Sequence, residues 1–201
     1  MINTSRLRRI VGWLAVSLPW IVGLLTLIFQ SGVIWPESIS ATYFYASCIT
    51  PFMIILGSAS ILLMCYSGYD KTDDVLNTIA SIFGLGICLF PTWGPSEFIG
   101  TFQLPVALSS TFHNICAIAF FALLAYISIF QFTKSSGEMT KNKRIRNVIY
   151  VVCGFGMLLS FGLMLLPYFA IQIWLVEMIA LTFFGLSWLT KADCYKWLFA
   201  D

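Results

Sequence analysis

The chain has 201 residues, of which 59% are hydrophobic and 10% are charged, and its mean hydropathy is +0.89. Soluble domains carry about 25% charged residues, so a water-soluble fold of this size could not cover its surface with polar groups. The net charge of +2 is too small to predict nucleic-acid binding, and the composition therefore predicts a protein that lies in a lipid bilayer.

Six apolar segments are long enough, at about 20 residues each, to cross a bilayer as an α-helix. They are 11–29, 42–66, 75–91, 112–132, 148–169 and 173–190. The first follows a basic start and resembles a signal peptide, but its length suits a span and no small-residue cleavage site follows it. We therefore expect it to be retained as a helix. The segment 92–111 is the longest predicted outer loop.

Lysine and arginine residues set the predicted orientation, because cytoplasmic loops of membrane proteins carry an excess of both. In a six-span layout all eleven basic residues fall on one side of the membrane. A layout with five or seven spans would divide them between the two sides. We therefore predict an all-α, single-domain bundle of six transmembrane helices over 1–201, with both termini in the cytoplasm.

The predicted topology brings polar residues of three spans to the same outer depth. Glu177, the clearest ionisable residue within a span, lies near the outer end of the last one, and His113, the only histidine, begins the fourth. An ionisable group at the centre of a span costs about 2.5–3.5 kcal/mol on insertion scales and is typical of a functional site. The other candidates are Asn114 and, from the segment that leads into the second span, Ser40, Tyr43 and Tyr45.

Three interpretations of this predicted pocket remain open. In an enzyme, His113 would be a general base oriented by Glu177, and Ser40 or Ser110 would be the nucleophile that attacks a lipid headgroup. In a binding protein, a sensor or a small transporter, Glu177 and His113 would recognise a lipid or another small ligand, or relay a proton or cation. In the third interpretation His113 or a tyrosine only forms a pair with Glu177 that satisfies its buried carboxylate. We expect Glu177 and His113 within hydrogen-bond or one-water reach.

The sequence offers no complete metal site, because a lone histidine with one deep carboxylate is too few ligands for catalytic zinc. We accordingly predict neither a metal nor a cofactor. The six cysteines form no Cys-x-x-Cys pair, which indicates packing residues. The Asp-rich turn 70–74 would either hold a divalent ion or cap the third span. Membrane lipids are the expected partners, since the basic residues on the inner side, in 134–146 and at Lys191 and Lys196, attract anionic headgroups. No pattern specifies an oligomeric state.

Four short motifs resemble, in the same order, those of a family of uncharacterised bacterial six-helix integral membrane proteins. They are a Ser-Ile-Ser-x-x-Tyr-like segment in 38–45, a Gly-Tyr-x-x-x-Asp turn in 68–73, Leu-Phe-Pro in 89–91 and the histidine that opens the fourth span, His113. The resemblance implies a bacterial inner-membrane protein. Alkaline ceramidases and adiponectin-receptor-like membrane hydrolases offer a second comparison, but these have several histidines around a metal, whereas this sequence has one.

Overall fold

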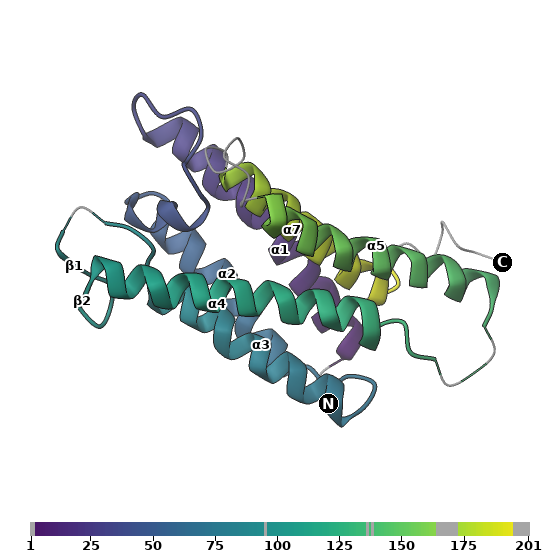
Figure 1. Cartoon of the computed structure of the whole chain (residues 1–201). Coiled ribbons are helices and arrows are strands. Elements are labelled where there is room, and N and C mark those ends of the chain that lie inside the picture. Colours follow the sequence, from purple (N-terminus) through teal and green to yellow (C-terminus); the bar gives the residue numbers. More distant parts are fainter. Residues whose placement is uncertain (1–2, 95, 136, 138, 164–172, 195–201) are drawn as a thin grey trace.

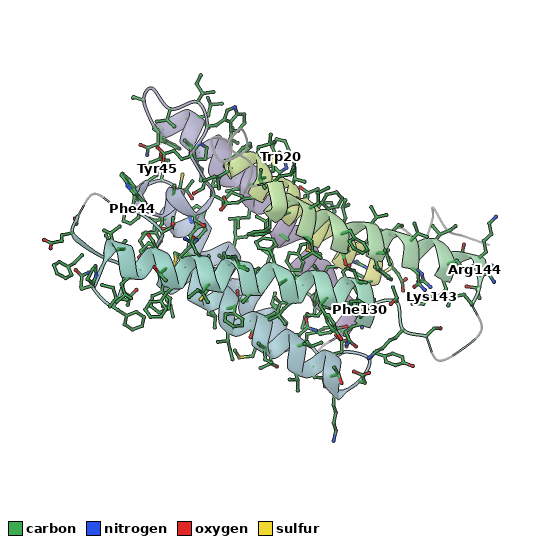
Figure 2. All side chains as sticks on the ribbon, viewed as in Figure 1. Trp20, Phe44, Tyr45, Phe130, Lys143 and Arg144 are labelled. Carbon is green, nitrogen blue, oxygen red and sulfur yellow. The ribbon has the colours of Figure 1, made fainter. Side chains whose placement is uncertain are left out.

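The computed structural model describes residues 3–94, 96–135, 137, 139–163 and 173–194. Within these residues the chain is mainly helical (Figure 1), and side chains project outward from the helices (Figure 2). The main helices are α1 (Thr4–Phe29), α2 (Ile49–Met64), α3 (Lys71–Leu89), α4 (Val106–Tyr126), α5 (Lys141–Leu163) and α7 (Ile173–Lys191). The smaller elements are a 3-10 helix (Ser40–Phe44), a π-helical turn that extends α4 (Ile127–Gln131), and the strands β1 (Phe98–Ile99) and β2 (Leu104–Pro105).

Helices that follow one another in the sequence are also neighbours in space. From α1 to α5 each helix packs against the next, α5 packs against α7, and α7 packs back against α1. These six helices therefore form a closed ring, in which α1 and α7 are the pair that joins the two ends of the described chain (Figure 1). A ring of this kind encloses a central space to which every helix can contribute side chains.

Five helices of the described part of the chain are long and apolar enough to cross a membrane: α1, α3, α4 with its π-helical turn, α5 and α7. The sixth, α2, is apolar but has 16 residues. Large apolar side chains such as Ile54, Ile118 and Leu159 are at least 60% exposed. Exposed apolar surface of this extent is typical of a helical bundle whose outer face meets lipid.

Two helices begin where local chemistry requires it and not where the apolar runs begin. The second predicted span starts at residue 42, whereas α2 starts at Ile49. Pro51 lies in the first turn of α2, where its missing N–H removes no intrahelical hydrogen bond, so Pro51 starts the helix instead of kinking it. The third span starts four residues early, at Lys71, because the Asp70 side chain accepts a hydrogen bond of 2.9 Å from the Asp73 N–H and caps α3.

The predicted outer loop 92–111 is shorter than expected. Its last residues are helical, because α4 begins at Val106, directly after Pro105. Before them, β1 and β2 pair as an antiparallel hairpin, which the apolar pattern did not predict. Gly100 has a φ of 74°, a conformation that glycine adopts without a steric penalty, and it lies in the turn of this hairpin. The fifth predicted span corresponds to α5, and its last residues, 164–169, lie outside the described residues.

Candidate functional site

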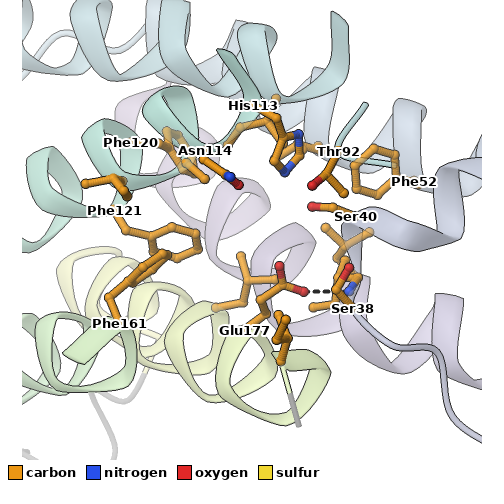
Figure 3. Close-up of a pocket in the computed structure, with 18 of the residues that line it drawn as sticks. Ser38, Ser40, Phe52, Thr92, His113, Asn114, Phe120, Phe121, Phe161 and Glu177 are labelled. Atoms are coloured by element: carbon orange, nitrogen blue, oxygen red, sulfur yellow. Dashed lines mark hydrogen bonds between the residues drawn. The ribbon is translucent and has the colours of Figure 1, made fainter. Parts of the chain in front are cut away.

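A cavity of about 550 Å³ lies inside the ring, and residues from all six main helices line it. Pockets of about 300–1,000 Å³ are usual for small-molecule sites. Polar side chains surround one part of the cavity and aromatic side chains close the other, as Figure 3 shows. The polar group consists of Ser38, Ser40, Thr92, His113, Asn114 and Glu177. The aromatic group consists of Phe120, Phe121 and Phe161, whereas Phe52 lines the cavity on the side of Thr92 and Ser40 (Figure 3).

Glu177 joins the start of α7 to the segment that precedes α2. Its carboxylate oxygen Oε2 accepts a hydrogen bond of 2.5 Å from the backbone N–H of Ile39. One turn earlier in α7, the backbone N–H of Trp174 donates to the Glu37 carbonyl oxygen over 3.1 Å. The Trp174 ring also stacks on Trp35 with ring centroids 4.6 Å apart. These contacts hold the segment before α2 against α7 and direct the rest of the carboxylate toward the cavity (Figure 3).

Short-range hydrogen bonds give the segment around Ser40 its shape. The Ser38 hydroxyl oxygen accepts a hydrogen bond of 2.9 Å from the Ala41 N–H, which is the capping contact expected of serine at the start of a helical turn. The Thr42 hydroxyl donates back to the Ile39 carbonyl oxygen over 2.6 Å. The resulting 3-10 helix leaves the Ile39 N–H free for Glu177 and brings the buried Ser40 side chain to the cavity wall.

His113 is held by the chain segment that follows α3. Its Nδ1 atom lies 2.7 Å from the Phe90 carbonyl oxygen, and because a carbonyl can only accept, Nδ1 carries a proton and donates it. Phe90 is the residue at the end of α3, where carbonyl groups lack helical partners. In the same region the Ser109 hydroxyl donates to the Pro91 carbonyl oxygen over 2.7 Å, and Ser110 donates to that of Thr92. The His113 ring points into the cavity (Figure 3).

The structure brings Glu177, His113, Asn114 and Ser40 to one cavity, and it leaves Tyr43 and Tyr45 outside the cavity lining. Both tyrosines are half-buried and pack on the apolar core. Glu177 and His113 lie on different sides of the cavity, and neither is the other's hydrogen-bond partner, because each side chain bonds to the backbone instead (Figure 3). The expectation that Glu177 orients His113 is therefore corrected, since the Phe90 carbonyl has that role.

Two kinds of lining residue were not expected from the sequence. Thr92 follows the end of α3, where no helical or strand periodicity indicates which way a side chain points. The phenylalanines of the aromatic group lie within continuous apolar runs, in which every helical face is equally hydrophobic.

At the opposite end of the ring, the three carboxylates of the Asp-rich turn 70–74 form hydrogen bonds and one ion pair with nearby groups. The Asp73 carboxylate accepts a hydrogen bond of 2.9 Å from the Tyr69 N–H, and the Asp74 carboxylate accepts one of 2.6 Å from the Gly68 N–H. Asp70 caps α3 and also forms an ion pair of 2.7 Å with Lys134. The hydrogen bond from Lys134 holds the pKa of Asp70 below its ordinary value. Capping of α3 and the ion pair thus account for Asp70, and hydrogen bonds from the two residues before the turn account for Asp73 and Asp74.

The comparisons with known proteins give no relative from which a role could be transferred. No protein-family model matches the chain, and neither a curated protein nor a solved structure matches it.

Proposed function

We propose that the chain is a single-domain bacterial inner-membrane protein with six spans and both termini in the cytoplasm. Contacts that basic side chains make between neighbouring helix ends support this orientation. Arg8 at the start of α1 donates to the Lys191 carbonyl oxygen at the end of α7, and Lys134 after α4 pairs with Asp70 before α3. The basic residues therefore gather at one end of the ring, as expected for the cytoplasmic side. The bacterial origin rests on the motif resemblance of 38–45 and 68–73.

The function that the geometry supports best is the binding of one amphipathic molecule, a lipid or a lipid-like compound, in the central cavity. The carrying observation is the division of the cavity into a polar part around Glu177 and His113 and an aromatic part around Phe120, Phe121 and Phe161 (Figure 3). A polar head would lie in the first part and an apolar chain in the second, where the aromatic side chains would pack against it in place of neighbouring lipid chains.

In the polar part of the cavity Glu177 and His113 offer hydrogen-bond acceptors, whereas the hydroxyl and amide groups of the other residues can both donate and accept. The Glu177 carboxylate has two oxygens and about four lone-pair sites, of which the backbone N–H groups of Ile39 and Ser40 use two. In a neutral His113 ring, Nε2 is an acceptor because Nδ1 already donates to Phe90. A polar head with N–H donors, and above all a positively charged amine, complements this set better than a carboxylate head would.

A membrane-embedded hydrolase or transferase that acts on lipid headgroups is the second candidate. His113 Nδ1 is fixed by a backbone carbonyl, an arrangement that would leave Nε2 free to act as a base, and Ser40 lines the same cavity. A small proton- or cation-linked transporter is the third, because Glu177 is an ionisable group within a span. Turnover of a lipid that stops in a His113→Ala variant would favour the hydrolase, and ion flux into vesicles that stops in Glu177→Gln would favour the transporter.

Two glycines provide a matched test of the binding proposal. A Cβ atom added at Gly162 or at Gly57 meets no atom within 4 Å, but only Gly162 lines the cavity. We expect dodecylamine to raise the melting temperature of the detergent-solubilised protein more than dodecanol or dodecanoic acid does. Gly162→Leu should diminish this shift because it adds a side chain at the cavity wall, and Gly57→Leu, which adds the same side chain to a helix elsewhere, should retain it.

Two outcomes would contradict the binding proposal. Equal shifts by the three amphiphiles would show that their polar ends are not distinguished, and an undiminished shift in Gly162→Leu would show that they bind outside the cavity. The melting temperatures of the two variants without amphiphile provide the control for folding.

A further inference from the structure

A second polar site lies at the basic end of the ring, away from the cavity. It consists of three cationic side chains, Arg8, Lys143 and Lys191, which we call the basic cluster. Arg8 lies in the first turns of α1, Lys143 in the first turn of α5, and Lys191 is the last residue of α7. All three side chains are partly buried, unlike the exposed Lys141 and Arg144 on the neighbouring positions of α5. The basic cluster has no part in the proposed function.

The two lysines of the basic cluster converge on one backbone carbonyl group. The Nζ atom of Lys143 donates to the Phe132 carbonyl oxygen over 3.0 Å, and that of Lys191 donates to the same oxygen over 3.3 Å. The separation of the two ammonium groups therefore cannot exceed the sum of these distances. Two like charges at such a separation repel each other, and the repulsion is stronger for partly buried groups than for groups in water.

Arg8 extends the cluster toward α2. Its guanidinium group donates two hydrogen bonds, of 3.0 and 3.3 Å, to the Tyr66 hydroxyl oxygen, and a third of 3.4 Å to the Lys191 carbonyl oxygen. Aromatic rings support the cations, because Lys191 Nζ lies 5.0 Å from the centre of the Phe132 ring and the Arg8 guanidinium carbon 5.3 Å from that of Tyr66. These neutral partners orient the cations without neutralising them.

Carboxylates do not balance the basic cluster within the described part of the chain. The two ion pairs closer than 4.0 Å among the described residues join Lys134 to Asp70 and Arg146 to Asp193, and neither includes a member of the cluster. The buried Asp73 carboxylate attracts Lys191 and Arg8, but one carboxylate offsets the three positive charges of the basic cluster only in part. Arg146 also repels Lys191, but its own charge is paired with that of Asp193.

We propose that the basic cluster binds a phosphate group. Phosphate oxygens accept charge-assisted hydrogen bonds from ammonium and guanidinium groups, and each lysine has three donors, of which the described contacts use one. A phosphate among the three cations would replace their mutual repulsion by attraction. On the proposed topology the site faces the cytoplasm, so the phosphate belongs either to an anionic phospholipid of the inner leaflet or to a soluble phosphorylated compound.

The exposed neighbours of the cluster supply the control for a test. The double variant Lys143→Gln with Lys191→Gln removes two charges that converge, and Lys141→Gln with Arg144→Gln removes two that point to solvent. Affinity for short-chain phosphatidylglycerol, short-chain phosphatidylcholine and inorganic phosphate would be measured from ligand-dependent melting shifts of each protein. We expect the first double variant to lose about tenfold in affinity for phosphatidylglycerol and the control to change less than about twofold.

The outcomes separate the two sources and can overturn the site. Binding of phosphatidylglycerol but not inorganic phosphate identifies a lipid, whereas binding of inorganic phosphate identifies a soluble phosphorylated ligand, and either supports the site. An equal loss in both double variants would reduce the effect to general surface charge, and binding of phosphatidylcholine as tight as that of phosphatidylglycerol would show that the cations do not select an anionic phosphate. Either outcome would overturn the site. Should the first double variant fail to fold, Lys143→Gln alone, with Lys141→Gln as its control, must show the same contrast.

Discussion

Glu177 has two roles at the scale of the single residue. One carboxylate oxygen satisfies the N–H of Ile39, a residue that is 3% exposed, and the side chain also lines the cavity. A substitution at this position therefore changes both the attachment of the segment before α2 and the chemistry of the cavity. Variants that differ in only one of these properties can separate them.

Glu177→Ala is predicted to destabilise the protein by about 1–3 kcal/mol, because it leaves the buried Ile39 N–H without a partner. Glu177→Gln should cost less, since the amide oxygen can still accept that hydrogen bond. The melting temperatures of both variants in detergent provide the measurement. A Glu177→Gln variant as unstable as Glu177→Ala would mean that the charge, and not the hydrogen bond, holds the segment against α7.

The meeting of Glu177, His113, Asn114 and Ser40 at one cavity could be predicted because helix ends on the same side of a membrane must lie at the same depth. Their hydrogen-bond partners could not be predicted in this way. Ile39 and Phe90 contribute backbone groups, which every residue carries, and only the three-dimensional path of the irregular segments determines which of these groups are free.

At the scale of the helix, the ring closes where two glycines let α1 and α7 approach closely. A Cβ atom at Gly185 would lie 2.7 Å from the Gly12 carbonyl oxygen and would also clash with the Val16 side chain. A Cβ at Gly12 would lie 2.7 Å from Leu189 Cγ. Small residues of this kind bring helix backbones together in a bilayer, where the hydrophobic effect gives no net attraction between helices.

Gly185→Val is predicted to destabilise the protein by about 1–3 kcal/mol through overpacking of the α1–α7 contact. Gly57→Val is the matched control, because a Cβ at Gly57 meets no atom within 4 Å. Both would be compared by thermal unfolding in the same detergent. If the two variants melted at the same temperature, the close approach of α1 and α7 would not limit stability.

Helix positions could be predicted from the apolar runs, but helix ends could not. The last predicted span agrees with α7 to within one residue, because its charged flanking residue and its apolar run coincide. The start of α2 differs by seven residues, since apolar residues before Ile49 fold into the 3-10 helix and a turn. Hydropathy reports where the solvent is lipid, whereas capping groups and proline determine where the helical hydrogen bonds begin.

At the scale of the whole molecule, the distribution of basic residues predicts the path of the chain through the bilayer. Alkaline phosphatase, which is active only outside the cytoplasm, should be active when fused after residue 34 and inactive when fused after residue 70. A fluorescent protein fused after residue 201 should fluoresce in the cytoplasm. Active phosphatase after residue 70 would mean that α2 does not cross the membrane and would overturn the six-span proposal.

The short length of α2 has a consequence for the surrounding bilayer. Its 16 residues span about 24 Å, whereas the hydrocarbon core of a bilayer is about 30 Å thick. If α2 crosses as proposed, the bilayer beside it must become thinner locally, so that the lipid chains are not exposed to polar groups. The hydrophobic mismatch is confined to one side of the ring, so the protein should deform the membrane asymmetrically and favour bilayers built from shorter acyl chains.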